Sequence, residues 1–253
     1  MNRPFRVLVC NDDGYMSLGI QALAHALEGL GEWRRAVREH MPDGARVCDV
    51  GAGTGQWALA FTTWFSARVI AVEPSRGMRS EGRAKVRGLA VDYVAGCGEA
   101  IPLRTASCDA AWISTVIHHF RDLAACAVEL RRVVRPGGAA LVRSAFPGRT
   151  GGISLFQFFP EAANVVETYP TVDATVTTFQ SAGFGLVSLD GVAQKTVGDL
   201  PSYRARVSNR SADTTLQLIS DDAYARGLAR LDAAIAGGDE TPVVDTLDLL
   251  VFR

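Results

Sequence analysis

Short apolar runs rich in Val and Ile alternate with segments of helical period along most of the chain, and this rhythm limits the fold more than any other feature. Strands that helices cover on both faces are apolar throughout, so the alternation is typical of a parallel sheet with helices on both sides. We therefore expect an α/β fold. The expected strands are residues 5–10, 45–50, 67–72, 90–95, 108–116, 139–144, 185–189 and 243–252.

The residues between these strands predict the connections. A short helix over residues 33–41 ends at a Pro-Asp-Gly turn, and residues 135–138 (RPGG) predict a turn that starts the fifth of the strands after residue 44. Residues 146–176 are rich in Gly, Phe and Thr and contain two prolines, so we expect a loose segment of the kind that covers ligands. Residues 220–222 (SDD) predict the cap of a last helix.

Composition narrows the classes of partner. The formal net charge is -1 and the charges are mixed along the chain, which argues against nucleic acid and membrane surfaces and favours a small-molecule partner. No apolar stretch approaches the roughly 18 to 20 residues needed to cross a bilayer. The cysteines are far apart, so we expect reduced thiols in a cytoplasmic protein, and the oligomeric state stays open. They are Cys10, Cys48, Cys97, Cys108 and Cys126.

The strongest local signal is a glycine-rich turn that directly follows a buried strand and precedes a helix. Residues 47–56 read VCDVGAGTGQ, with glycines in GxGxG spacing. Glycine permits positive φ and close approach of a ligand to the backbone, and the first amides of the following helix favour negatively polarised groups. The spacing is one residue tighter than the GxGxxG pattern of dinucleotide-binding units.

A second signal is Glu73, which ends the next strand. It lies close to the offset of about 20 residues at which an acid meets ribose hydroxyls in nucleotide-binding βαβ units. An ordinary tight turn with a surface glutamate is the alternative. The binding interpretation is favoured because both features follow the carboxyl ends of strands, where open α/β sheets bind ligands.

From about Trp33 to Arg253 the chain resembles the class I S-adenosylmethionine (SAM)-dependent methyltransferases of the ubiquinone-biosynthesis type. The segments that carry the resemblance are residues 49–55, Glu73, and residues 96–103, 114–120 and 130–138. The resemblance implies a Rossmann-like, doubly wound sheet of seven mostly parallel strands whose last strand is antiparallel. It also implies SAM as cofactor.

Within this family the glycine turn packs on the methionine part of SAM, the acid after the second strand binds both ribose hydroxyls, and residues after the third strand contact adenine. The cofactor-binding residues implied for this chain are Asp49, Gly51, Gly53, Gly55, Gln56, Glu73, Cys97, Gly98, Glu99 and Ser114. Cys97 departs from the pattern, because many relatives have Asp there and a thiol is a poor acceptor for the adenine amino group. Alternatively, Cys97 is only a small buried side chain without a role in binding, and the sequence favours both interpretations equally.

His118 and His119 follow the fourth strand of the resembling region, at the mouth through which an acceptor would approach the methyl group. Either is a candidate general base; the alternative is that one packs on the cofactor or caps a helix while the other faces solvent. Methyl transfer needs a base only if the acceptor must lose a proton. Four aromatic residues are candidates for an apolar pocket, although such clusters more often belong to the core. They are Phe156, Phe158, Phe159 and Tyr169.

Residues 6–31 do not fit this family and resemble the opening of the survival-protein (SurE) nucleotidases, through the sequence NDDG at 11–14 and the helix behind it. There the paired acids, here Asp12 and Asp13, bind a divalent metal. The loops that complete the metal site have no counterpart downstream, so we expect neither a metal site nor phosphatase activity. We interpret the chain as a chimera in which a nucleotidase-like βα segment (residues 1–32) precedes a methyltransferase domain (33–253); an ordinary turn at NDDG is the alternative.

The sequence thus predicts transfer of the SAM methyl group to O, N or C of a small, apolar metabolite. Two alternatives stay open. One is a metal-dependent 5'-nucleotidase or phosphatase, and the other is a SAM-binding protein without activity.

Overall fold

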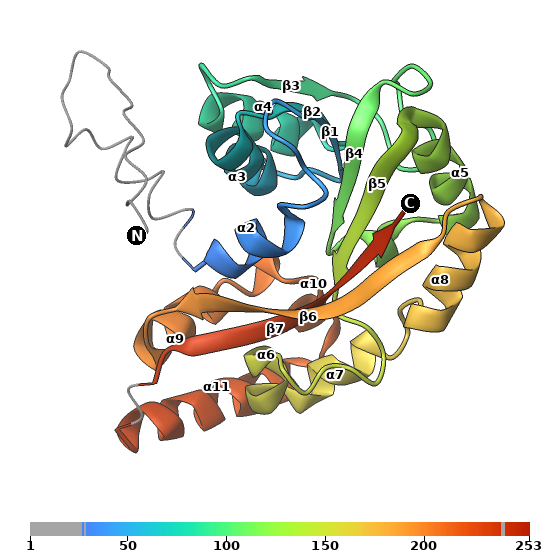
Figure 1. Cartoon of the computed structure of the whole chain (residues 1–253). Coiled ribbons are helices and arrows are strands. Elements are labelled where there is room, and N and C mark those ends of the chain that lie inside the picture. Colours follow the sequence, from blue (N-terminus) through green and yellow to red (C-terminus); the bar gives the residue numbers. More distant parts are fainter. Residues whose placement is uncertain (1–26, 28, 239–240) are drawn as a thin grey trace, which may run out of the picture.

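A computed structural model describes residues 27, 29–238 and 241–253. Seven strands form one sheet in the order β3-β2-β1-β4-β5-β7-β6 (Figure 1). The strands are β1 Arg46–Val50, β2 Arg68–Val72, β3 Val91–Val94, β4 Cys108–Ser114, β5 Val134–Ser144, β6 Leu186–Val197 and β7 Val243–Phe252. Strands β1 to β5 are parallel, and β7 runs antiparallel to both β5 and β6. This confirms the expected doubly wound sheet with an antiparallel last strand.

Helices cover both faces of the sheet. They are α2 Gly31–Val37, α3 Gln56–Phe65, α4 Arg76–Lys85, α5 Leu123–Val133, α6 Ser154–Phe158, α7 Pro160–Val166, α8 Val172–Ser181, α9 Leu200–Ser208, α10 Thr214–Leu218 and α11 Asp221–Ala236. Helices α2 and α3 lie on one side, and α5 and α8 on the other (Figure 1).

The alternation of side chains along each strand divides the core between these faces. Trp33 of α2 and Phe61 of α3 are fully buried against Trp112 of β4, with the Trp33 and Trp112 ring centroids 6.1 Å apart. On the opposite face, Leu130 of α5 and Phe179 of α8 pack into a second cluster. Burial of each such side chain contributes about 1.5 to 3 kcal/mol, so the two layers fix the central strands firmly.

A third apolar cluster lies at the far end of β6 and β7, where helices α6, α7 and α11 gather beneath these strands (Figure 1). The expectation of a loose segment over residues 146–176 is wrong, because α6, α7 and the start of α8 occupy it. Pro160 and Thr171 in this segment begin helices rather than interrupt them. Pro160 is the first residue of α7, where its missing N–H costs nothing, and the Thr171 side chain accepts a hydrogen bond from the Ala174 amide at 3.1 Å to cap α8.

Two strands are longer than expected. β5 begins at Val134 rather than Ala139, and the predicted RPGG turn lies within it as an irregularity: Cys108 of β4 pairs with Val134, whereas Ala110 pairs with Ala139. Gly137 adopts φ +78° there. β6 continues from Leu186 to Val197 because its antiparallel pairing with β7 runs along both strands.

The expected N-terminal strand and the paired acids Asp12 and Asp13 lie outside the described residues. Within the described part of the chain, no group of three or more His, Cys, Asp or Glu side chains is placed to hold a metal ion. None of the helices in that part is both long enough and apolar enough to cross a membrane.

Candidate active site

The glycine turn joins the carboxyl end of β1 to α3, with Gly51, Gly53 and Gly55 at φ values of +70°, +54° and +82°. Two of these glycines are required by close packing: a Cβ on Gly51 would lie 2.9 Å from Cγ1 of Val116, and one on Gly55 would lie 2.4 Å from the hydroxyl of Tyr93. Gly53 is different, because a Cβ there would meet no atom within 4 Å. The turn therefore leaves open space next to Gly53 that a ligand can fill.

Glu73 follows β2 and faces this turn, with only 5% of its surface exposed. One carboxylate oxygen accepts a hydrogen bond from the Gly53 amide at 2.9 Å, and the other accepts one from the Ser75 amide at 2.8 Å. A carboxylate has about four acceptor sites, so both oxygens retain capacity for a ligand's hydroxyl groups. The alternative of a surface glutamate is wrong.

Asp49 precedes the turn on β1 and is 2% exposed. Its Oδ2 has no hydrogen-bond partner among the described residues. Burial, together with the nearby charge of Glu73, raises the pKa of Asp49 to about 7. A buried carboxylate oxygen without a donor is costly, and its position at the turn suits a ligand that carries a donor or a positive charge.

Three more predicted cofactor residues follow β3, and Ser114 is the last residue of β4. Cys97 forms an isolated antiparallel bridge with Ala100, and an added Cβ on Gly98 would lie 2.6 Å from the Phe120 ring. The Glu99 carboxylate accepts a hydrogen bond from the Arg121 amide at 2.8 Å. The two loops thus lie at the same carboxyl edge of the sheet as the glycine turn.

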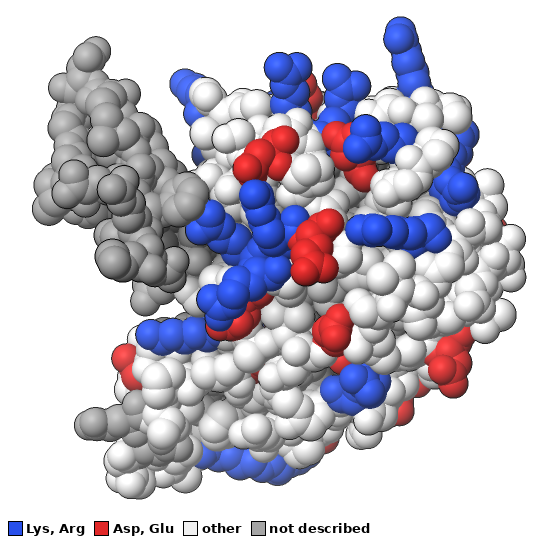
Figure 2. Space-filling view, in the orientation of Figure 1, with Lys and Arg blue, Asp and Glu red and all other residues white. Residues whose placement is uncertain are grey.

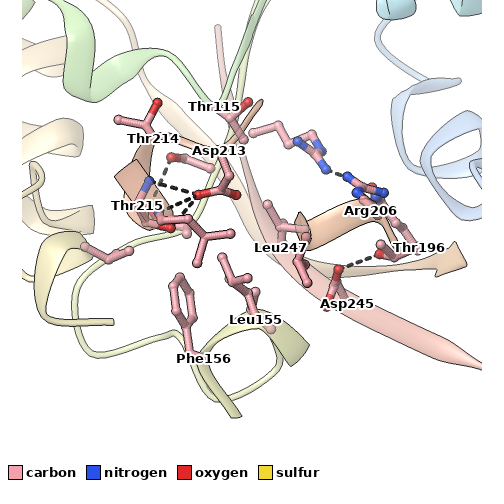
Figure 3. Close-up of a pocket in the computed structure, with 18 of the residues that line it drawn as sticks. Thr115, Leu155, Phe156, Thr196, Arg206, Asp213, Thr214, Thr215, Asp245 and Leu247 are labelled. Atoms are coloured by element: carbon pink, nitrogen blue, oxygen red, sulfur yellow. Dashed lines mark hydrogen bonds between the residues drawn. The ribbon is translucent and has the colours of Figure 1, made fainter. Parts of the chain in front are cut away.

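A cavity of about 760 Å³ opens next to this edge, between the ends of β4 and β5, strand β6 and helices α6, α9 and α10. Gln56, the first residue of α3, and His118 both line it. Figure 3 shows Arg206, Thr196 and Asp245 together on one side, Asp213, Thr214 and Thr215 on the other, and Leu155 and Phe156 below them. Other lining residues include Trp57, Thr115, Arg143, Tyr169, Gln194, Lys195, Tyr203 and Leu247.

The two candidate histidines have different surroundings, although they are adjacent in the 3₁₀ turn Ile117–His119. His119 is exposed and does not line the cavity. His118 lies in the cavity wall, stacked on Tyr169 with ring centroids 3.9 Å apart and planes 2° apart. Burial, helped by His119 and opposed by Asp213, lowers the pKa of His118 to about 4. His118 is therefore a neutral imidazole at physiological pH, and neither of its ring nitrogens has a partner among the described residues.

Of the four aromatic pocket candidates, Phe156 and Tyr169 line the cavity. Phe159 instead belongs to the core, fully buried against Gly227. Phe158 packs partly buried against the third apolar cluster. The hydroxyl of Tyr169 is buried and has no hydrogen-bond partner in the described part of the chain.

The sequence interpretation missed the charged residues of the cavity, above all Arg143 on β5 and Asp245 on β7, both buried. For Arg143 a signal existed, because it follows an apolar run in a strand that pairs on both sides, where a buried charge is rare unless it has a specific role. Asp245 gave a weaker signal, because its strand also contains Thr246 and Asp248 and pairs there with β6 alone.

Comparisons of the sequence with known proteins find similarity to methyltransferases. Residues 48–142 match the family described as methyltransferase domain. The demethylmenaquinone methyltransferase of Corynebacterium kroppenstedtii is 38% identical over 112 residues, which cover 44% of this chain and 47% of that protein. The ubiquinone/menaquinone biosynthesis C-methyltransferase of Rubrivivax gelatinosus is 37% identical over 129 residues, covering 50% and 47%. The chain thus spans about half the length of these curated relatives.

A solved structure described as a methyltransferase from an antibiotic biosynthesis pathway of Anabaena variabilis aligns with a TM-score of 0.70 and 21% identity, covering 87% of this chain and 96% of that one. This likeness extends the shared fold well beyond the matched domain. The family match ends at residue 142, so the matched part holds the glycine turn and Glu73. Most of the cavity wall comes from the residues that follow it.

Proposed function

Residues 48–142 match the family described as methyltransferase domain, and we propose that the protein transfers the methyl group of SAM to O, N or C of a small molecule. The observation that carries the proposal is the glycine turn with Glu73 hydrogen-bonded across it to Gly53. The strand order reverses at β1, between β2 and β4, and the crevice at such a switch point is where open α/β sheets bind ligands.

The residues at this crevice fit SAM. Glu73 has acceptor capacity for the ribose hydroxyls, the open space beside Gly53 accommodates the methionine part, and the unpartnered oxygen of Asp49 suits its positive charge. Cys97, Gly98 and Glu99 are the proposed adenine contacts, and Gly51, Gly55, Gln56 and Ser114 complete the proposed set. When bound, the cofactor supplies an activated methyl group on a sulfonium, which is a good leaving group.

The chain's own contribution is alignment of the acceptor in the adjoining cavity, since in-line positioning supplies much of the acceleration of such a transfer. Where the acceptor must lose a proton, His118 is the proposed base, because it lies in the cavity wall as a neutral imidazole and neither ring nitrogen has a hydrogen-bond partner among the described residues. His119 is exposed and is the weaker candidate of the two.

The proposal also includes the domain bounds, the cellular location and the class of partner. We retain residues 33–253 as the methyltransferase domain and residues 1–32 as a nucleotidase-like segment of a chimera. Free thiols at Cys48, Cys97, Cys108 and Cys126 support a cytoplasmic location. Acidic and basic side chains are interspersed on the face seen in Figure 2, which supports a small molecule rather than a nucleic acid as partner.

The proposal is tested by incubating the full chain with methyl-labelled SAM and a panel of phenols, amines and carbon acids. Label in a product, with one S-adenosylhomocysteine formed per methyl group transferred, is the expected result. SAM binding without turnover on any acceptor would instead identify a binding protein. Release of phosphate from nucleoside monophosphates in the presence of a divalent metal, without methyl transfer, would contradict the proposal.

A further inference from the structure

Arg143 is a buried cation without a carboxylate partner. It lies on β5 in the cavity wall, and 7% of its surface is exposed. One terminal nitrogen donates to the Ser114 hydroxyl at 3.2 Å and the other to the Gln194 side-chain oxygen at 2.8 Å, while Nε has no partner among the described residues. No described carboxylate lies within ion-pair distance of this guanidinium.

The surroundings compensate this charge only in part. The guanidinium carbon lies 4.8 Å from the Trp33 ring centroid and 5.2 Å from that of Trp57, and such contacts stabilise a desolvated cation. Burial still lowers the pKa of Arg143 to about 10, so the group is charged at neutral pH but held at a cost. A buried cation is normally paired with an anion, and here the cavity is the open side from which one can come.

Asp245 is near enough to raise the pKa of Arg143, which offsets part of the effect of burial, but both cavity carboxylates already accept other hydrogen bonds. Asp245 accepts hydrogen bonds from the Ser154 amide and the Thr196 hydroxyl, which Figure 3 shows beside it. Asp213 accepts from the amides of Thr215 and Leu216 and from the Thr215 hydroxyl, and so caps α10.

Further positive charge lines the same cavity. Arg206 of α9 is close enough to Arg143 to lower its pKa, and Lys195 of β6 also contributes to the wall. The adjacent wall is apolar, formed by Leu155, Phe156 and Leu247. The cavity therefore combines a cationic end with an apolar surface.

We propose that the methyl acceptor is an amphipathic carboxylic acid, whose carboxylate binds Arg143 and Arg206 and whose apolar body packs on Leu155, Phe156 and Leu247. This inference rests on the proposed function. SAM also carries a carboxylate, on its methionine part. Arg206 and the apolar residues line the cavity, whereas Gly51, Gly53 and Glu73 of the proposed SAM site do not. This favours the acceptor, rather than SAM, as the molecule whose carboxylate binds Arg143.

The test measures binding of phenylacetate and cinnamate, each beside its primary amide, by calorimetry with and without S-adenosylhomocysteine. In the unsubstituted protein at least one acid should bind about tenfold or more tightly than its amide, the scale of a charged hydrogen bond. Arg143→Gln and Arg206→Gln should each reduce this preference towards unity and leave affinity for S-adenosylhomocysteine within about twofold. Arg206 is exposed, so its variant should fold even if Arg143→Gln does not.

Arg226→Gln is the matched control, because Arg226 is exposed, pairs with Glu161 and does not line this cavity. Equal binding of every acid and its amide by the unsubstituted protein, or no saturable binding of either acid at millimolar concentration, would overturn the inference. It would also be overturned if Arg143→Gln weakened S-adenosylhomocysteine but not methylthioadenosine, which lacks the amino-acid part, since the cofactor's carboxylate would then be the ligand. Failure of the proposed function is distinguishable, because it would appear as absence of SAM binding or of methyl transfer while the preference for acids remains.

Discussion

Asp49 and Glu73 occupy neighbouring strand ends, yet their environments differ. Glu73 accepts hydrogen bonds from two backbone amides, whereas one oxygen of Asp49 is buried without a donor. The sequence identified Glu73 by its position at the end of an apolar strand, and Asp49 through the family resemblance. It did not indicate the contrast between them, because the contrast depends on how the turn after β1 folds back over Glu73.

Asp49 should make stability depend on pH. Its pKa is raised from 3.8 to about 7 on folding, so the folded state binds more protons than the unfolded state across this interval and stability falls as pH rises through it. Asp49→Asn should remove this dependence, gaining roughly 2 to 4 kcal/mol over the unsubstituted protein at pH 8 and little at pH 4. Urea unfolding at the two pH values measures the difference. The control is Asp92→Asn, exposed on β3; parallel curves for the unsubstituted protein and Asp49→Asn would contradict the expectation.

His118 should titrate well below an ordinary histidine. Burial in the cavity wall disfavours its charged form, and its pKa is lowered to about 4. Its ring signals in a proton NMR titration, identified by their loss in His118→Phe, should therefore be those of a neutral imidazole from pH 8 to about pH 5. A midpoint near 6.5 for these signals would show that the ring is solvated rather than held in the wall.

Among the elements, the glycine turn was the part best predicted from sequence. Its spacing, the strand before it and the helix after it all agree with the structure, since each depends on neighbouring residues. The helices α6 and α7 were missed for the opposite reason. They are five and seven residues long, so they have too few turns to show a helical period and are stabilised by packing in the third cluster.

Two glycines of the turn should respond differently to alanine. Gly55→Ala places a Cβ against the Tyr93 hydroxyl at a φ of +82°, and should destabilise the protein by roughly 1 to 3 kcal/mol. Gly53→Ala meets no atom, so it should cost about 1 kcal/mol, for the left-handed backbone alone, and chiefly weaken SAM binding by filling the open space. Thermal unfolding and SAM titration of both variants separate the effects. Equal loss of stability, with Gly53→Ala binding SAM normally, would place the ligand elsewhere.

At the scale of the whole molecule, the sequence predicted the proposed SAM site at the carboxyl edge of the sheet better than the cavity proposed for the acceptor. The sheet and the carboxyl-edge residues follow from local patterns and from the rule that parallel strands end at one edge. The cavity joins Arg143, Gln194 and Arg206, which come from β5, β6 and α9 and share no sequence pattern. Their proximity depends on the long antiparallel pairing of β6 with β7, which extends eight residues past the predicted end of the strand, Leu189.

The most direct test of the central claim is calorimetric titration of the full chain with SAM, repeated with Glu73→Ala, Glu73→Gln and the exposed control Glu39→Ala. We predict saturable one-to-one binding that both Glu73 variants weaken by about 1.5 to 3 kcal/mol, the contribution of charged hydrogen bonds to the ribose hydroxyls, while Glu39→Ala leaves it unchanged. Absence of SAM binding to the folded, unsubstituted protein, or binding that neither Glu73 variant weakens, would contradict the account.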